Sequence, residues 1–284
     1  MFLENVKHIL KVDNGKVFSY IMHTLTDNNY NVQIINISPH EYGIPQQRER
    51  VFFICIRNDI YNGKDIKLIE DKTDKIILNN YLQNKNEIDK KYFIKDTILN
   101  VLNAWDEMIK EFEIGEKISP TILINEFYKE YTQEEFKKLA SWRQNYIIKN
   151  KPLYQKYKNK WDIWYNKYKD LLNTREIYCK LEWQVGIIKK DDSIFNYIIQ
   201  IRQSGIRVKK LKYFPTLVAI SQVPIYGKEK RYITARECAR IQSFSDNYIL
   251  DENDKINYKQ LGNSVNVNNV YNIINSTLKE YKLI

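Results

Sequence analysis

Hydrophobic and polar positions follow two spacings in the first 57 residues. A short apolar run at residues 1–3 ends in polar groups at residues 4–6. After a turn at residues 13–15, apolar residues recur at helical spacing over residues 17–25. Two further apolar runs, residues 32–37 and 51–56, have the length and composition of strands. This order of strand, helix and strands predicts a layered α/β sheet, and three strands are few for a stable open sheet.

The pattern changes over residues 59–196. Two charged segments, residues 97–117 and 132–173, have apolar residues at roughly helical spacing and predict helices, and the second is rich in Tyr and Trp. From Trp142 to Tyr168, aromatic residues alternate with basic ones, as on some nucleic-acid-binding surfaces. We favour a helix pair that buries these aromatics, because aromatic side chains mostly supply core area.

Strand-like runs return at residues 195–201 and 216–220. Between them, a cationic stretch is expected on a loop or a strand edge, where it forms either a binding surface or a solvated loop. This stretch holds Arg202, Arg207, Lys209, Lys210 and Lys212.

The last 50 residues predict two helices separated by a turn. Thr234 and Glu237 have the spacing of a capping box, which predicts a helix over residues 234–244. Residues 258–265 predict a turn, and apolar residues at helical spacing predict a final helix through Tyr281. Free backbone N–H groups at a Gly-Asn-Ser turn before a helix are suited to ligand binding.

Composition narrows the class of protein only slightly. With 45 basic and 35 acidic residues among 284, the net charge of +10 favours an anionic partner such as nucleic acid. The abundance of Lys, Asn, Ile and Tyr also fits an AT-rich coding sequence, so the charge is weak evidence. Three widely spaced cysteines predict a reducing compartment and no metal site. Without a signal peptide or a membrane-length apolar run, we expect a soluble cytoplasmic protein.

The segment over residues 42–57 is the strongest candidate for chemistry. A Tyr-Gly-Ile-Pro turn precedes Gln46, Arg48 and Arg50, and a buried strand follows at once. Arginine is always charged and binds phosphate or base edges through two parallel hydrogen bonds. These residues alone are equally compatible with an ordinary loop of surface arginines.

Four ordered blocks together resemble the second half of a cytosine-5 DNA methyltransferase. Residues 4–6 look like the family's Glu-Asn-Val block, and residues 46–50 match its Gln-x-Arg-x-Arg block. Residues 236–240 are similar to its Arg-Glu-x-Ala-Arg block, and residues 262–265 to its Gly-Asn-Ser-Val block. A Thr-Leu pair at residues 216–217 matches the family's recognition region. The resemblance covers most of residues 1–57 and 200–284.

The resemblance implies an α/β fold with two parts. We expect an incomplete Rossmann-like sheet of an S-adenosylmethionine-dependent methyltransferase, together with a mixed α/β target-recognition domain that carries a helical insertion. The expected boundaries are residues 1–58 for the second half of the catalytic domain and 59–260 for the recognition domain. Residues 59–196 are its variable helical insertion, and residues 261–284 form a helix that returns to the catalytic domain.

The resemblance also implies roles for residues. In this family a cysteine thiolate adds to C6 of a flipped cytosine, so that C5 can attack S-adenosylmethionine. Glu4 would donate a hydrogen bond or proton at N3, which requires a carboxyl kept protonated by burial. Arg50 would bind O2, while Asn5, Gln46 and Arg48 hold phosphate or local structure. Asn263, Ser264 and Val265 would contact the cofactor. The residues expected to face double-stranded DNA are Arg202, Arg207, Lys209, Lys210, Thr216, Leu217, Arg236 and Arg240.

The family's glycine-rich cofactor loop and Pro-Cys nucleophile precede its Glu-Asn-Val block, and this sequence contains neither. We therefore expect the chain to be a subunit or the carboxy-terminal part of the enzyme, inactive alone. A partner polypeptide would carry the nucleophile and most of the cofactor site, within a restriction–modification system. An inactive frameshifted fragment and a non-catalytic, sequence-specific DNA-binding module are the alternatives.

Overall fold

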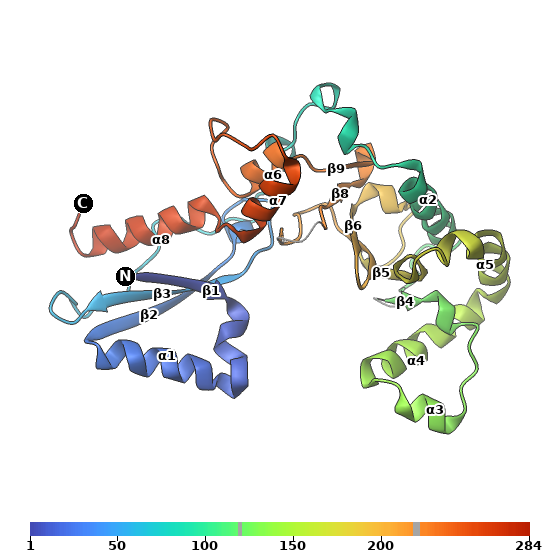
Figure 1. Ribbon diagram of the computed structural model, residues 1–284, viewed down its shortest axis with the longest axis horizontal. Coiled ribbons are helices and arrows are strands. Elements are labelled where there is room, and N and C mark those ends of the chain that lie inside the picture. The colour runs from blue at the N-terminus through green and yellow to red at the C-terminus, as the bar shows by residue number, and fades with distance from the viewer. Residues whose placement is uncertain (119–120, 218–221) are drawn as a thin grey trace. The chain divides into compact units, whose positions relative to one another are not determined.

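The computed structural model describes residues 1–118, 121–217 and 222–284. The chain forms two compact units (Figure 1). Unit 1 comprises residues 1–82, 212–221 and 235–284, and unit 2 comprises residues 83–211 and 222–234. The division differs from the expected boundaries at residues 58 and 260. Residues 59–82 and 235–260 belong to unit 1 because they pack against its sheet and final helices, as described below.

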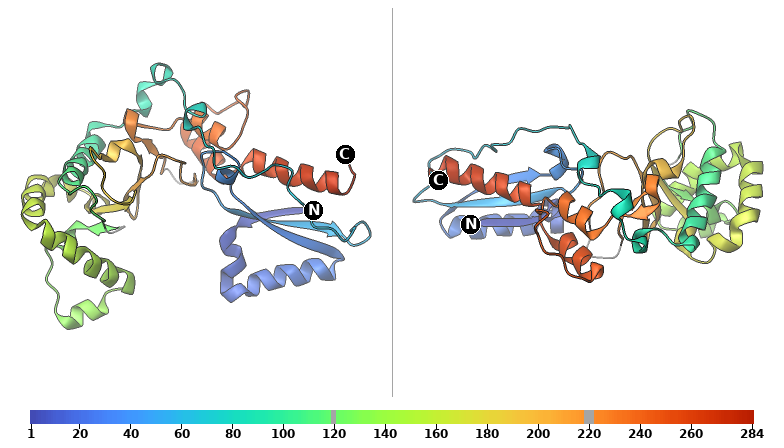
Figure 2. Two further views of the ribbon diagram at one scale, coloured as in Figure 1. Left: turned by 180° about the vertical axis from the view of Figure 1, so that it is seen from behind. Right: turned by 90° about the horizontal axis from the view of Figure 1, so that it is seen from above.

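Unit 1 is built around a three-stranded antiparallel sheet. Its strands are β1 (Phe2–Val6), β2 (Tyr30–Ile37) and β3 (Arg50–Arg57), in the order β1-β3-β2. The side chains of β3 alternate between two apolar clusters. Val51, Phe53 and Cys55 pack with α1 (Lys16–Asp27), whereas Phe52 and Ile54 pack with α8 (Val267–Glu280) on the opposite face. Figures 1 and 2 show the sheet between these two helices. The expected strand–helix–strand order is confirmed.

Two linking segments complete unit 1. The backbone of Ile66 exchanges hydrogen bonds of 2.7 and 3.1 Å with the Gln33 amide of β2, which fixes residues 59–82 to the sheet. Helix α6 (Ala235–Ile241) precedes α7 (Asp254–Asn263). The Gln242 side chain donates to the carbonyl of Leu261 at 2.7 Å, so the two helices are held together.

The turn expected over residues 258–265 is mostly helical, which corrects the sequence-based expectation. Helix α7 begins beyond Asn253, whose side chain accepts a hydrogen bond from the Lys255 backbone at 3.0 Å. It continues through Gly262 to Asn263, and the chain turns only between α7 and α8. Local capping by Asn253 therefore outweighs the low helix propensity of one glycine.

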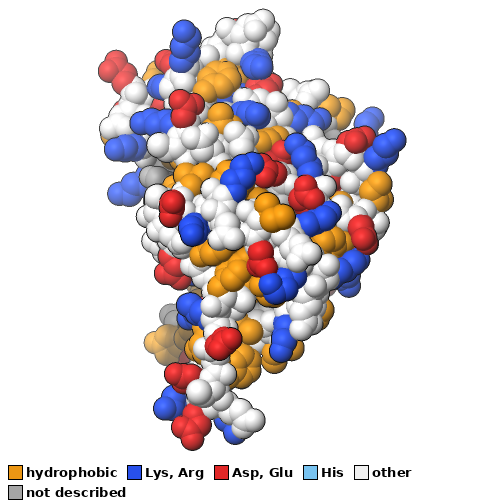
Figure 3. All heavy atoms as spheres, turned by 90° about the vertical axis from the view of Figure 1, so that its right-hand side faces the viewer, with side chains coloured by type: hydrophobic (Ala, Val, Ile, Leu, Met, Phe, Trp, Pro, Cys, Tyr) orange, Lys and Arg blue, Asp and Glu red, His pale blue; other side chains and the backbone are white. Residues whose placement is uncertain are grey.

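Among its described residues, unit 2 contains a six-stranded sheet and four α-helices. The helices are α2 (Asp96–Lys110), α3 (Gln133–Lys138), α4 (Ser141–Lys156) and α5 (Lys158–Leu172). Trp105, Trp161 and Trp164 meet in its core, whereas Trp142 lies exposed. The expected burial of aromatics thus holds for α5 and fails for Trp142. Lysines of α4 and α5 pair with glutamates of the α2 region, as at Lys167 and Glu107, separated by 2.9 Å. In Figure 3, basic and acidic side chains are accordingly intermixed.

The sheet of unit 2 has the order β4-β5-β7-β6-β8-β9. Its strands are β4 (Ile122–Leu123), β5 (Lys180–Gln184), β6 (Ile198–Arg202), β7 (Gly205–Lys209), β8 (Ile225–Tyr226) and β9 (Arg231–Tyr232). Part of the cationic stretch expected on a loop or edge, Arg207 and Lys209, lies in the inner strand β7, which is parallel to β5 and antiparallel to β6. The strand expected over residues 216–220 lies partly outside the described residues, and Thr216 and Leu217 are not in a strand.

Candidate active site

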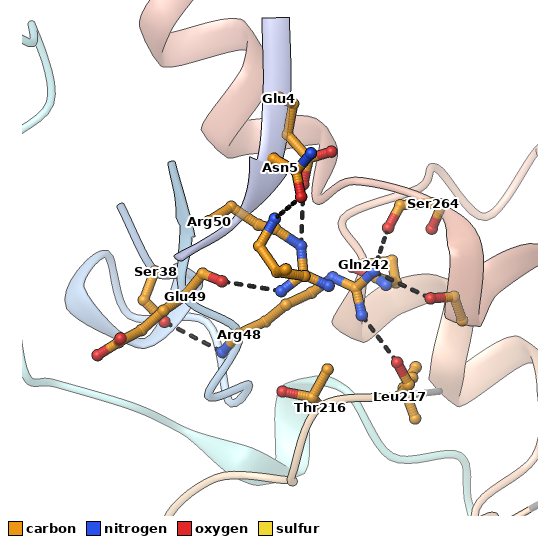
Figure 4. Close-up of polar contacts among 12 residues, drawn as sticks. Glu4, Asn5, Ser38, Arg48, Glu49, Arg50, Thr216, Leu217, Gln242 and Ser264 are labelled. Carbon is orange, nitrogen blue, oxygen red and sulfur yellow. Dashed lines mark hydrogen bonds and ion pairs between the residues drawn. The ribbon is translucent and has the colours of Figure 1, made fainter. Parts of the chain in front are cut away.

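Glu4 and Arg50 form an ion pair on one face of the sheet in unit 1. Glu4 lies in β1 opposite Phe52, and Arg50 begins β3 opposite Val6, so the two side chains are diagonal neighbours. Arg50 Nε lies 2.9 Å from Glu4 Oε1 (Figure 4). The side chains are 13% exposed for Arg50 and 29% exposed for Glu4. Burial lowers the pKa of Arg50, which the neighbouring Glu4 carboxylate partly offsets. The pair presents a carboxyl and a guanidinium side by side.

Arg48 is buried within unit 1, where its guanidinium binds three backbone carbonyls. Its Nη1 donates to the carbonyl of Leu217 at 2.7 Å, and its Nη2 donates to the carbonyls of Gly262 and Ser264 at 2.9 and 2.7 Å (Figure 4). Burial, followed by repulsion from Arg50, lowers the pKa of Arg48 to about 10, so it remains charged near neutral pH. Arg48 thereby joins the Gln-x-Arg-x-Arg segment, the Thr-Leu pair and the Gly-Asn-Ser-Val block.

A short turn presents Arg48 to these carbonyls. Ser38 and Glu41 form a capping box around Pro39, and the Glu41 carboxylate accepts from the Ser38 backbone at 3.0 Å. The Ser38 hydroxyl in turn accepts from the backbone N–H of Arg48 at 3.1 Å. The loop that carries the arginines is therefore held at both ends.

The Asn5 side chain has a local hydrogen-bond partner, whereas the Gln46 side chain has none among the described residues. The side-chain oxygen Oδ1 of Asn5 accepts a hydrogen bond from the backbone N–H of Val6 at 2.8 Å. Gln46 is fully buried, and neither its amide nitrogen nor its amide oxygen has a hydrogen-bond partner among the described residues. Both expected roles of Gln46, phosphate binding and local structure, stay predictions.

The three residues expected at the cofactor follow the end of α7. Asn263 is exposed, and Ser264 donates through its hydroxyl to the Leu261 carbonyl at 2.8 Å. Val265 packs against the apolar cluster beneath α8. The Asn263 amide offers a donor and an acceptor, which suit the carboxylate or hydroxyl groups of S-adenosylmethionine.

Four residues expected to bind DNA have partners within unit 1. Thr216 donates to the Gln47 carbonyl at 2.6 Å, and Leu217 is buried with its carbonyl on Arg48. Arg236 donates to the Tyr248 carbonyl at 2.8 Å, and Arg240 forms a fork with Asp246 at 2.7 and 3.0 Å. Both arginines thus hold the segment that follows α6, and their contact with DNA stays a prediction.

The other four expected DNA ligands lie on or beside β6 and β7 of unit 2. Arg202 ends β6, Arg207 and Lys209 lie in β7, and Lys210 follows it in an exposed position. The first three share one face of the sheet, as the strand register requires.

Sequence reasoning missed the partners that orient these arginines. Glu182 binds Arg207, and the carbonyl of Gly262 binds Arg48. A backbone carbonyl leaves no trace in a sequence. The Lys-Leu-Glu-Trp-Gln alternation over residues 180–184 does predict a strand with Glu182 opposite its apolar face, and that signal was available.

All three cysteines are free and buried. Burial raises the pKa of the Cys55 and Cys179 thiols and raises that of Cys238 well above its usual value. Within the ranges that the structure covers, no group of three or more His, Cys, Asp or Glu could hold a metal ion. The helices of these same ranges are too short or too polar to cross a bilayer.

Comparisons with known proteins agree on a single family. The family C-5 cytosine-specific DNA methylase matches residues 1–279. Type II methyltransferase M.BanI of Aneurinibacillus aneurinilyticus is 24% identical over 96% of this chain and 69% of its own length. M1.ScrFI of Lactococcus lactis subsp. cremoris is 25% identical over 98% and 51%, and M.AluI of Cellulosimicrobium cellulans is 32% identical over 48% and 26%.

The fold has a counterpart among solved structures. A prophage-encoded protein of E. coli, described as a DNA modification methyltransferase, has a TM-score of 0.51 at 15% identity, over 98% of this chain and 68% of that one. The chain spans about half of M1.ScrFI and about a quarter of M.AluI. Because the family match extends over nearly the whole sequence, the chain belongs to the C-5 cytosine-specific DNA methylase family.

Proposed function

We propose that this chain supplies the cytosine-binding, target-recognition and closing parts of a DNA cytosine-5 methyltransferase of a restriction–modification system. The observation that carries the proposal is the Glu4–Arg50 pair, held at 2.9 Å at the start of β3. The nearby Arg48 fixes the surrounding loops. The type II methyltransferases similar to this chain support the restriction–modification setting.

The pair suits the Watson–Crick edge of a cytosine extruded from the duplex. Arg50 donates to O2 of the base, and a protonated Glu4 donates to N3. Both contacts stabilise the charge that develops in the ring when a thiolate adds to C6. The Glu4 side chain is 29% exposed, so a bound base and DNA would bury it further.

The nucleophile and the glycine-rich loop come from polypeptide outside this sequence, either upstream in the same protein or in a partner chain. The sequence holds no Pro-Cys pair, and its three thiols are buried with raised pKa values. Strand β1 supports this proposal, because it ends the sheet and all five of its residues are exposed. An open edge with Phe2 and Leu3 exposed is suited to pairing with a further strand.

S-adenosylmethionine supplies the methyl group when bound. From this chain, Asn263 and Ser264 would contact it, with Val265 packed beneath them. Arg48 would keep this turn in place, since it binds the carbonyls on either side of Asn263.

The test is methyl transfer from labelled S-adenosylmethionine to DNA. The chain is co-expressed with the polypeptide that carries the glycine-rich loop and Pro-Cys pair, and the product is mapped to cytosine C5. We expect methyl transfer by the two co-expressed polypeptides, the assembled enzyme, and none by the chain alone. If the chain binds a specific duplex but the assembled enzyme transfers no methyl group, the chain is a DNA-binding module instead.

A further inference from the structure

One face of the unit 2 sheet is polar where the opposite face forms the core. Leu181, Val208 and Ile199 point into the apolar cluster of unit 2. The register places Glu182 beside Arg207, and Arg207 beside Gln200, on the other face. Three adjacent central strands therefore align a carboxylate, a guanidinium and an amide in one row.

A single carboxylate, that of Glu182, organises this row. Its Oε2 accepts from Arg207 Nε at 2.6 Å, and its Oε1 accepts from the Ser204 hydroxyl at 2.8 Å. Arg202 Nη1 lies 3.9 Å from Oε2 and has no hydrogen-bond partner among the described residues. Because both carboxylate oxygens are engaged, the Glu182 side chain cannot rotate without losing a contact.

The row carries more positive than negative charge. Arg202 and Arg207 flank the Glu182 carboxylate, and Lys209 lies on the same face of the sheet. Burial is the main cause that lowers the pKa of Lys209, and repulsion from Arg207 and Arg202 lowers it further. Burial also lowers the pKa of Arg202, with a smaller contribution from repulsion by Arg207. An electron-rich ligand would relieve this crowding of cations.

We propose that Glu182 is a positioning residue that holds Arg207 to read a guanine of the DNA target. The inference rests on the proposed function, which makes DNA the ligand. Among the described residues, Arg207 is held through Nε, and this leaves its Nη1 and Nη2 groups for a base. Two parallel donors of that kind match O6 and N7 of guanine in the major groove.

The hairpin between β6 and β7 keeps this arrangement rigid. Gly205 has a φ of +130°, and a Cβ there would lie 2.7 Å from Cβ of Lys180 on β5. Only glycine allows the hairpin to approach β5 so closely. Arg207, two residues beyond, is thus fixed relative to Glu182, as base reading requires.

The experiment selects bound sequences from a randomised duplex library with the full chain. It is repeated with Arg207→Lys, Glu182→Ala and the control Arg175→Ala, which changes an exposed arginine of the same unit. We expect the wild-type chain to select one invariant guanine. Arg207→Lys should lower the preference at that position about 10- to 100-fold with an unchanged salt dependence, because lysine keeps the charge and lacks the fork. Glu182→Ala should relax the same position, and Arg175→Ala should leave the selection unchanged.

The proposal is overturned if Arg207→Lys relaxes the preference at no guanine position. It is also overturned if Arg207→Lys weakens binding equally on all duplexes. Thermal unfolding identifies a variant that fails to fold. If Glu182→Ala fails to fold, Arg207→Lys alone tests the proposal. Methyl transfer is measured separately on the selected duplex. Guanine selection without methyl transfer by the assembled enzyme would refute the proposed function and leave this inference standing.

Discussion

Glu4 lies close enough to Arg50 for both side chains to contact the Watson–Crick edge of one cytosine, which makes Glu4 the most direct residue to test. Replacing Glu4 with Gln keeps the size of the side chain and removes its acidic proton. We expect turnover of the assembled enzyme to fall about 10²- to 10⁴-fold, the usual contribution of a general acid. The partly exposed ion pair contributes little to folding, so stability should change by less than about 1 kcal/mol.

The control for this prediction is Glu49→Gln, which removes an exposed carboxylate that pairs with Lys7 at 3.1 Å. It should leave turnover within a few-fold of wild type. Glu4 would be excluded from the reaction if Glu4→Gln behaved like this control in single-turnover methyl transfer.

Arg48 contributes to stability rather than to chemistry. Arg48→Ala leaves the carbonyls of Leu217, Gly262 and Ser264 without their buried cationic donor. Hydrogen bonds to a charged group are among the stronger ones, so we expect a loss of about 2–4 kcal/mol in the free energy of unfolding. Urea denaturation measures it. Arg57→Ala, which breaks an exposed pair with Asp59 at the other end of β3, should cost less than about 1 kcal/mol.

The turn before a buried strand indicated Arg48 and Arg50 as candidates, and the resemblance of residues 4–6 to the family's Glu-Asn-Val block indicated Glu4. The sequence did not show which groups Arg48 binds. The acceptors of Arg48 lie 169 to 216 residues away in the chain. No local pattern encodes contacts at that separation, and their geometry exists only in the folded chain.

At the level of elements, the first 57 residues were predictable because each strand and the helix α1 has its own apolar period. Strand β7 was not, because its alternating Arg and Lys resemble a solvated loop until Glu182 of β5 is seen beside them. Helix α7 was misread because Gly262 suggested a turn, while the capping by Asn253 that begins the helix lies nine residues earlier in the chain.

Strand β1 gives a prediction at this same scale. In the isolated chain its outer edge faces solvent, so its outward backbone amides should exchange hydrogen rapidly. Pairing with a further strand would slow that exchange, and hydrogen exchange measured by mass spectrometry would detect it on assembly with the polypeptide that carries the nucleophile. The amides of β3, already paired on both sides, serve as the internal control. If the amides of β1 exchanged equally fast before and after assembly, the further polypeptide would not pair with β1.

At the scale of the whole molecule, the proposed function requires a reactive thiol. Burial raises the pKa of Cys55, Cys179 and Cys238, so less thiolate is present at pH 8 than on a free cysteine. The native chain should therefore react slowly with iodoacetamide at this pH, whereas the unfolded chain should take up three equivalents.

By the same argument, the chain alone should form no covalent complex with duplex DNA that contains 5-fluorocytosine. The assembled enzyme should form one that survives denaturing electrophoresis, because fluorine at C5 prevents release of the thiolate at C6. A covalent complex formed by the chain alone and lost in Cys238→Ser would show that a buried thiol of this family member can act as the nucleophile, and the requirement for polypeptide outside this sequence would then be wrong.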